Sequence, residues 1–352
     1  MNVLLLGGTG AMGWHLVKLL EEDNKIFVTS RKPRQSSKNV TFLLGNAHDL
    51  RFIKQVLLLQ KWDVIVDFMM YDITEFTSRK DLLLSSCKQY VSLSSARVYA
   101  DCTLLSEDSP RLIDTITDRD YFNAHDYSLN KALMENELFK SEAHNYTIIR
   151  PYITYSENRL QLGCLEKEDW LYRVFNGHSL VISEDILEKK TTLTYGYDVA
   201  RTIKALMGRQ DALGHCFNPT QNESITWHEV LNIYLSVILK ETGISPEVKL
   251  LKKDPALKTD QGRWQVIYDR LYDRVFDNRK LNSFIDTDTF LKPKDGLEKC
   301  LRAFLKDPKF SSLSPGGTAM LDRASKEWSP YSYFDSIGIY IKYLLRRTIL
   351  KN

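Results

Sequence analysis

The chain has 352 residues, of which 43% are hydrophobic and 26% are charged, the composition of an ordinary globular protein. This length can bury a full core and suffices for one large domain or for two lobes. The formal net charge is only +3, so no global basic field indicates a nucleic-acid partner.

The cysteines and the position and length of the apolar runs exclude further classes of protein. The five cysteines are widely spaced, which predicts reduced thiols and neither a disulfide framework nor a metal site. An apolar strand begins at residue 2, which leaves no room for a cleavable leader before it. No apolar run approaches the ~18 residues of a membrane-spanning helix. We therefore expect a cytoplasmic protein.

The N-terminal stretch has the pattern of a nucleotide-binding strand, turn and helix. An apolar run, Val3 to Leu6, leads into a glycine-rich turn, an amphipathic segment from Trp14 to Glu21, and a second apolar run from Ile26 to Val28. Such a turn places phosphates at the N-terminus of the helix, although the same glycines could mark an ordinary structural turn. The predicted cofactor contacts in the turn are Gly7, Thr9, Gly10, Ala11, Met12 and Gly13.

Each glycine of the turn has an expected task. Gly7 permits the tight turn, Gly10 lets backbone N–H groups approach a pyrophosphate, and Gly13 allows the helix to pack closely against the strand. A dinucleotide is the ligand that this geometry favours.

The residues after the second strand bear on the choice of dinucleotide. An acid here would hold the ribose 2′-OH of NAD, whereas a cation would accommodate the 2′-phosphate of NADP. No acid lies between Ile26 and Arg34, and Arg31 is the expected cofactor contact, with Lys32 beside it. NADP is therefore favoured and NAD stays open, as does the alternative that both cations are solvated loop charges.

Two further strands are predicted to place side chains at the cofactor. Val40 to Leu44 reads as the third strand, and the following Asn46 would offer an amide oxygen to the adenine. Asp63 to Phe68 reads as a buried fourth strand, whose carboxyl end should bring Met69 and Met70 to the cofactor cleft. The alternative for both methionines is plain core packing.

Polar groups with catalytic potential follow. Ser95 comes after an apolar strand, and Tyr127 and Lys131 have the spacing Y-x-x-x-K at the start of a long helical run. A spacing of four puts the phenol and the ammonium on one helix face, one turn apart. A β-rich strand, Tyr146 to Ile149, then leads into Arg150-Pro151-Tyr152.

These features occur in an order that resembles the extended short-chain dehydrogenase/reductase superfamily, in its nucleotide-sugar-modifying branch, the NAD-dependent epimerase/dehydratase family. The resemblance rests on the G-x-x-G-x-x-G turn, the Ser-Ser-Ala-Arg-Val-Tyr segment at 94–99 and the Y-x-x-x-K pair. It implies that Ser95, Tyr127 and Lys131 are catalytic, that Tyr127 and Lys131 also hold the nicotinamide ribose, and that Pro151 closes the nicotinamide site. It further implies a nucleotide-sugar substrate, bound by Ser95, Arg97 and Tyr152, and a homodimer that pairs through helices near 74–87 and 127–140. The arginine that the family commonly has at the position of Thr191 is absent here, so Arg270 or Arg279 is the candidate for the pyrophosphate, and a solvated surface charge is the alternative for each.

The expected chemistry is a proton and a hydride moved together at one carbon. A free tyrosine is too weak an acid to ionise at neutral pH, so Lys131 would serve to stabilise the phenolate of Tyr127. Related dehydratases and decarboxylases carry acids at the positions of Ala96 and Arg97, so elimination is disfavoured. An epimerase-like reaction or reduction of a keto-sugar remains. A catalytically silent NADP-binding sensor or scaffold is the alternative, and a helix surface pair is the alternative for Tyr127 and Lys131.

Strands that alternate with helices predict an α/β fold, a Rossmann-type doubly wound parallel sheet with a smaller, mostly helical C-terminal substrate lobe. We expect residues 1–157 and about 191–222 in the dinucleotide-binding domain, and about 158–190 and 223–352 in the lobe. The basic C-terminal stretch from Ile339 to Asn352 contains Lys342, Arg346, Arg347 and Lys351. A helix docked on the body is favoured there over contact with a membrane.

Overall fold

The computed structural model describes residues 1–260 and 262–349, which divide into two compact units. Unit 1 comprises Met1–Thr154, Thr192–Asn222 and Phe276–Leu291. Unit 2 comprises Tyr155–Thr191, Glu223–Val275 and the described chain from Lys292 onward. Every site residue predicted from the sequence belongs to unit 1 except Arg270, which belongs to unit 2. Arg279, the alternative to Arg270, also belongs to unit 1.

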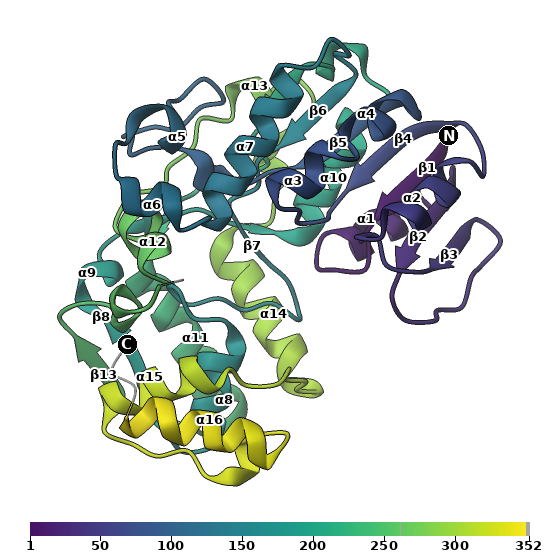
Figure 1. Ribbon diagram of the computed structural model, residues 1–352. Coiled ribbons are helices and arrows are strands. Elements are labelled where there is room, and N and C mark those ends of the chain that lie inside the picture. The colour runs from purple at the N-terminus through teal and green to yellow at the C-terminus, as the bar shows by residue number, and fades with distance from the viewer. Residues whose placement is uncertain (261, 350–352) are drawn as a thin grey trace. The chain divides into compact units, whose positions relative to one another are not determined.

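Unit 1 is built on a seven-stranded sheet in which neighbouring strands run parallel, in the order β11-β6-β5-β4-β1-β2-β3 (Figure 1). Because the strand order reverses at β1, ligands of such sheets bind outside the carboxyl ends of β1 and β4. The predicted Rossmann-type fold is confirmed. The strands are β1 (Asn2–Leu6), β2 (Lys25–Ser30), β3 (Val40–Leu44), β4 (Trp62–Asp67), β5 (Cys87–Leu93), β6 (Tyr146–Ile149) and β11 (His215–Phe217).

Helices cover both faces of the sheet because successive side chains of a strand point to opposite sides. Val3 and Leu5 of β1 join the core beneath α1 (Gly13–Leu20) and α10 (Gly196–Leu206). Leu4 and Leu6 join the core beneath the helices of the other face. Those helices are α2 (Leu50–Leu57), α3 (Ile73–Thr77), α4 (Lys80–Ser85) and α7 (Tyr127–Phe139).

The remaining elements of unit 1 are short. The expected return of the chain to the sheet is made by β11, whereas β10 pairs with β7 in a separate two-stranded sheet. The segment 276–291, expected in the smaller lobe, packs Leu281, Phe284 and Phe290 against the core of unit 1. The short elements are η1 (Ala96–Val98), α5 (Leu112–Thr115), α6 (Arg119–Asn123), β7 (Ile153–Tyr155), β10 (Leu193–Tyr195), η2 (Gln210–Ala212), α13 (Arg279–Asn282) and η5 (Thr287–Thr289).

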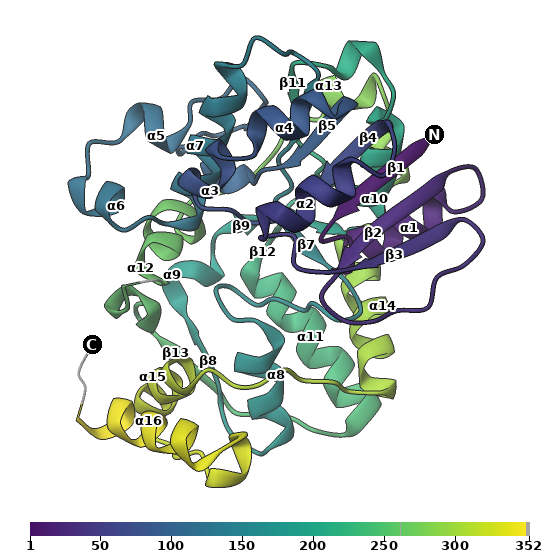
Figure 2. The same cartoon turned by 45° about the vertical axis from the view of Figure 1, so that its right-hand side comes forward.

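Unit 2 is mostly helical, as predicted for the C-terminal part (Figure 2). The rings of Trp170 and Tyr234 stack with 4.8 Å between their centres and join α8 to α11. None of the helices in the described part of the chain is both long and apolar enough to cross a bilayer. The elements of unit 2 are α8 (Lys167–Phe175), β8 (Leu180–Ser183), α9 (Glu184–Leu187), β9 (Lys190–Thr191), β12 (Ile225–Thr226), α11 (Trp227–Thr242), β13 (Val248–Leu251), η3 (Pro255–Lys258), α12 (Gly262–Gln265), η4 (Val266–Arg270), α14 (Pro293–Lys306), α15 (Pro315–Ser325), η6 (Tyr331–Tyr333) and α16 (Ile337–Thr348).

Candidate active site

The glycine-rich turn between β1 and α1 has the conformation that its sequence requires. Gly7 adopts φ +71°, a left-handed conformation that a side chain would strain, and a Cβ there would lie 2.7 Å from the sulfur of Met69. The Gly7 N–H donates to the hydroxyl of Thr29 at 2.9 Å, which ties the turn to the end of β2. Gly13 lies against the backbone of Gly8, because a Cβ on Gly13 would come 2.6 Å from the Gly8 carbonyl.

Gly10 differs from the other two glycines. A Cβ on Gly10 would have no described atom within 4 Å, so the absence of a side chain keeps open space beside the start of α1. Met12, at the N-cap of α1, makes no side-chain cap with any described residue, and the first turn contains no acid. The Trp14 N–H donates to the Gly10 carbonyl at 3.0 Å, so an anion would be bound by the other amides of this first turn. This turn fits the pyrophosphate of a dinucleotide, with Thr9 and Ala11 half-buried within it.

The groups expected to bind the adenosine half are exposed. Arg31 and Lys32 follow β2 directly and lie in solvent. Asn46 is exposed after β3, and its side-chain oxygen accepts the backbone N–H of His48 at 3.1 Å. An amide oxygen has two lone pairs, so this bond still leaves Asn46 able to accept a second donor.

The two methionines after β4 have different surroundings. Met69 is partly buried, packs against the core under α2 and touches Gly7. Met70 is 60% exposed and does not form part of that core. Core packing therefore describes Met69 and not Met70.

Lys131 connects α7 with the carboxyl ends of β4 and β5. Its side chain is buried, and its Nζ donates to the carbonyl of Leu93 at 2.6 Å and to that of Met69 at 3.3 Å. An ammonium carries three donors, so one is left for a ligand. Nζ also lies 5.9 Å from the centre of the Tyr127 ring. The two residues are therefore not a solvated surface pair.

Asp67, at the end of β4, supports this arrangement and was not predicted from the sequence. Its carboxylate accepts the Met69 N–H at 2.9 Å and the Tyr90 hydroxyl at 2.8 Å. Burial raises the pKa of Asp67, while these hydrogen bonds and the charge of Lys131 act in the opposite direction. Asp67 thus fixes the N–H of Met69, and the carbonyl of the same residue accepts from Lys131. An acid that ends an otherwise apolar strand was the available signal.

Ser95 and Arg97 lie beside the start of α7. The Ser95 hydroxyl accepts the Arg97 N–H at 3.2 Å and begins η1. The Arg97 guanidinium carbon lies 5.4 Å from the centre of the Tyr127 ring, and Nη2 lies 3.4 Å from a carboxylate oxygen of Asp126. Asp126 in turn caps α7 by accepting the Ser128 N–H at 2.8 Å. The serine turn and the tyrosine helix are therefore adjacent.

A buried ionic network holds the serine turn in place. Glu135 on α7 accepts the Ser94 hydroxyl at 2.6 Å and two nitrogens of Arg150, each at 2.8 Å. Arg111 adds a third contact to Glu135 at 3.2 Å. Glu135 was not predicted from the sequence, although an acid four residues after Lys131 shares the helix face that turns to the strands.

The segment after β6 closes against the same turn. The carbonyl of Pro151 accepts the Ala96 N–H at 3.0 Å. Tyr152 is buried, with its ring 5.5 Å from that of Phe276. Pro151 thus lies next to η1, and Tyr152 points into packed side chains of unit 1.

Arg270 lies in unit 2, apart from the other predicted site residues. It is buried there, where its guanidinium pairs with Asp269, donates to the carbonyl of Gly163 at 2.9 Å and lies 5.6 Å from the Trp227 ring. Its contact with the substrate stays a prediction. Its alternative, Arg279, is exposed and pairs with Asp277 at 2.6 Å.

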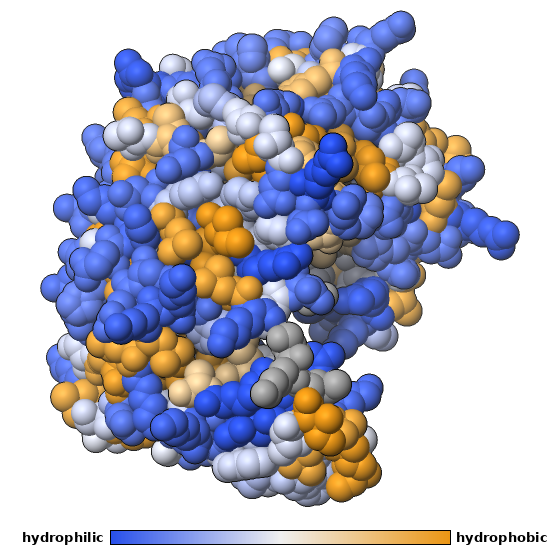
Figure 3. All heavy atoms as spheres, turned by 60° about the vertical axis from the view of Figure 1, so that its left-hand side comes forward, coloured by the Kyte–Doolittle hydropathy of each residue, from blue (hydrophilic) through white to orange (hydrophobic). Residues whose placement is uncertain are grey.

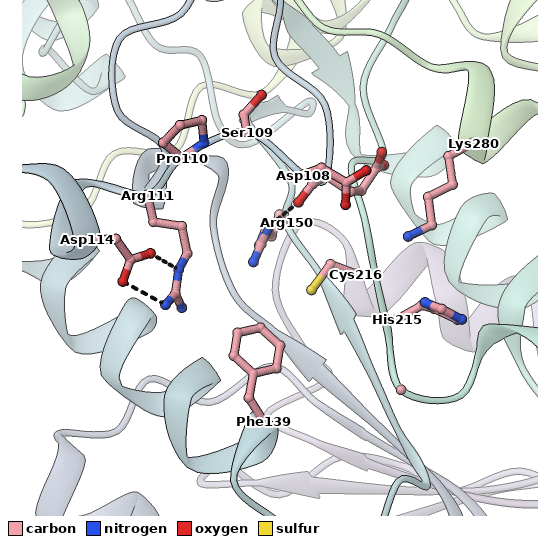
Figure 4. Close-up of a pocket in the computed structure, with 12 residues that line it drawn as sticks. Asp108, Ser109, Pro110, Arg111, Asp114, Phe139, Arg150, His215, Cys216 and Lys280 are labelled. Atoms are coloured by element: carbon pink, nitrogen blue, oxygen red, sulfur yellow. Dashed lines mark hydrogen bonds and ion pairs between the residues drawn. The ribbon is translucent and has the colours of Figure 1, made fainter.

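A separate hollow of about 380 Å³ lies in unit 1 beside β11 (Figure 4). Arg111 and Asp114 pair within it, Arg150 is held by Glu135, and the thiol of Cys216 has a pKa raised by burial to about 11. Its described lining includes none of the residues predicted from the sequence to bind cofactor or substrate. We therefore do not assign the reaction to it.

Comparison with protein-family models and with the sequences of characterised proteins finds no match. Solved structures do match. An epimerase from Methanothermobacter thermautotrophicus is 16% identical over 87% of this chain and 92% of its own, with a TM-score of 0.67. The UDP-N-acetylglucosamine 4-epimerase of Methanobrevibacter ruminantium, in complex with UDP-N-acetylmuramic acid, is 20% identical over 87% and 98%, with a TM-score of 0.65. The dTDP-glucose 4,6-dehydratase of Bacillus anthracis, in complex with NAD, is 17% identical over 87% and 97%, with a TM-score of 0.63.

This chain has the fold of these two epimerases and of this dehydratase. The fold predicted from the glycine turn and the strand and helix alternation is confirmed by these structures. The candidate site lies at the carboxyl ends of β4, β5 and β6, beside Met69, Leu93 and Pro151.

Proposed function

We propose that this protein transfers a hydride between a nicotinamide dinucleotide and a carbon of a nucleotide sugar, in an epimerase-like reaction. The observation that carries the proposal is the position of Lys131, whose buried Nζ binds the carbonyls of Leu93 and Met69 beside the Tyr127 ring. A buried ammonium with a free donor, next to a phenol at the carboxyl ends of parallel strands, suits proton transfer at a bound nicotinamide.

Each residue has a stated task in this reaction. A bound nicotinamide would supply the group that exchanges a hydride with the sugar carbon. Tyr127 takes the proton of the hydroxyl on that carbon and returns it when the hydride comes back. Lys131 stabilises the phenolate and directs its third donor to the nicotinamide ribose. Ser95 donates a hydrogen bond to the sugar oxygen and so orients the carbon.

We further propose that the dinucleotide is NADP. This proposal rests on Arg31 and on the absence of an acid between Ile26 and Arg34. Solved structures with the same fold are complexes with NAD. Titration calorimetry with both dinucleotides tests it: wild type should bind NADP more tightly, and Arg31→Ala should lose that preference while it keeps its affinity for NAD.

The reaction itself is distinguished by the cofactor found in the purified protein. An epimerase that returns the hydride to the same sugar retains its dinucleotide, so NAD or NADP released by denaturation supports epimerisation. A dinucleotide that exchanges freely and is consumed in its reduced form supports reduction of a keto-sugar. Incubation with UDP- and dTDP-sugars, followed by chromatography, should give a product that Tyr127→Phe does not form. Tight dinucleotide binding without turnover of any sugar would instead support the silent sensor.

The homodimer remains part of the proposal. We place its contact on the helices near residues 74–87 and 127–140, which are α3, α4 and α7. Light scattering at several concentrations tests the state. A charge introduced at the exposed Phe139 should reduce a dimer to monomers without loss of the fold.

A further inference from the structure

The C-terminal helix α16 is fixed to unit 2 through one side only. Tyr343 is fully buried with Leu313, Ala319 and Phe334. Its hydroxyl donates to Asp322 at 2.7 Å and accepts the Ser329 N–H at 2.9 Å. The docked helix favoured by the sequence is therefore present, but the contacts come from the face that contains Tyr343.

The opposite side of α16 presents a row of large apolar side chains. Ile337, Ile341, Leu345 and Ile349 follow one another at intervals of four residues, and their exposed fractions are 61%, 49%, 42% and 69%. Residues four apart lie on one helix face, and the helical rotation of about 100° per residue places these four side chains opposite Tyr343. Large apolar side chains exposed together in this way indicate a binding surface. We call these four residues the apolar row.

Aromatic and basic side chains accompany the apolar row. Trp328 and Tyr331, just before α16, are 54% and 49% exposed. Lys342 and Arg346 are exposed along one edge of the row, and Arg347 lies 4.5 Å from the Trp328 ring. Between residues 328 and 349 the sequence has these three cations and a single acid, Asp335. Figure 3 shows hydrophobic side chains gathered at the lower end, where α15 and α16 lie in Figure 1.

We infer that α16 is a docking surface for an anionic lipid bilayer, on which it lies flat with the apolar row in the headgroup region. Apolar, aromatic and basic residues in this arrangement are those of an interfacial helix, because the cations meet lipid phosphates while the row enters the acyl boundary. The helix has 12 residues, about 18 Å at 1.5 Å per residue, which lies in the interface and does not span it. A second copy of the chain is disfavoured as the partner, because a symmetric contact would bring Lys342 and Arg346 near the same cations of the other copy.

Vesicle flotation of the full chain tests the inference. Wild type should float with phosphatidylcholine vesicles that contain about 30 mol% phosphatidylglycerol, and not with pure phosphatidylcholine, because the attraction needs anionic lipid. Ile341→Ser with Leu345→Ser should lower the bound fraction about tenfold or more. Lys342→Gln with Arg346→Gln should lower the affinity by about fivefold per cation removed.

A matched control uses exposed apolar residues elsewhere in unit 2. Leu239 and Leu250 are 53% and 52% exposed, and their replacement by Ser should leave flotation unchanged. All variants change exposed side chains, so their thermal unfolding should match wild type.

Three results would overturn the inference. Wild type that does not float with the anionic vesicles is one. Row variants that float like wild type are another. The third is a wild-type dimer in solution that Ile341→Ser with Leu345→Ser converts to monomers without any flotation, which would assign the row to a second copy of the chain.

Discussion

Two cations lie within 6 Å of the centre of the Tyr127 ring, the guanidinium carbon of Arg97 at 5.4 Å and Nζ of Lys131 at 5.9 Å. Lys131 comes from the same helix, whereas Arg97 comes from the turn after β5. The phenol therefore has a second electrostatic partner that the Y-x-x-x-K pattern does not contain.

Removal of Arg97 should slow the reaction. Arg97→Met is expected to lower turnover about tenfold, because one cation beside the phenol is lost. Arg97→Lys keeps the charge and should recover part of that loss. Asp126→Asn keeps a helix cap and removes only the carboxylate that pairs with Arg97, so it should change turnover less than Arg97→Met does. Steady-state kinetics measure these changes, and turnover that Arg97→Met leaves unchanged would limit Arg97 to packing.

Replacement of Lys131 should impair both binding and chemistry. Lys131→Met leaves the Leu93 and Met69 carbonyls without their donor and removes the proposed contact to the ribose. We expect dinucleotide affinity to fall about tenfold by calorimetry and turnover to fall about 10²–10⁴-fold. Lys140→Met, an exposed position at the end of the same helix, is the matched control and should change neither quantity.

The two glycines at either end of the G-x-x-G spacing should respond differently to a methyl group. Gly13→Ala brings a Cβ to 2.6 Å from the Gly8 carbonyl, so the free energy of unfolding should fall by about 1–3 kcal/mol. Gly10→Ala meets no described atom within 4 Å, so stability should hold while dinucleotide affinity falls about tenfold or more. Chemical denaturation and calorimetry on the same samples separate the effects. Unchanged affinity in Gly10→Ala would contradict the placement of the pyrophosphate.

Acid should loosen the attachment of the C-terminal helices in unit 2. Burial acts to raise the pKa of Glu327, but hydrogen bonds from Ser179 and the charge of Arg173 outweigh it and lower the pKa to about 2. A lowered carboxyl pKa contributes stability that is present above about 4.5 and is lost as the pH falls from there through about 2. Glu327→Gln should be less stable at pH 7 and should lose less stability over that interval, measured by urea unfolding. Parallel pH curves for the two proteins would contradict this assignment.

The sequence determined the elements whose pattern is local. The apolar runs at Val3 and Val40, the glycine turn and the strand at Tyr146 follow from side-chain period and backbone freedom, and the structure has them at nearly the predicted bounds. The spacing of Tyr127 and Lys131 fixed that both lie on one helix face. The catalytic roles proposed for these residues remain predictions, because they come from the resemblance to a family and not from the spacing itself.

Only the tertiary structure decided which distant groups meet. The periodicity of apolar residues shows which face of a helix or strand is buried, but it does not show which element packs against that face. Glu135 meets Arg150, Lys131 meets the carbonyl of Leu93, and Arg270 meets the carbonyl of Gly163, and no local pattern in the sequence links the members of these pairs. The exposed row of α16 has the same origin, because an apolar pattern on both sides of a helix leaves packing to choose which side is covered. Lys351, part of the basic stretch noted in the sequence, lies outside the described residues.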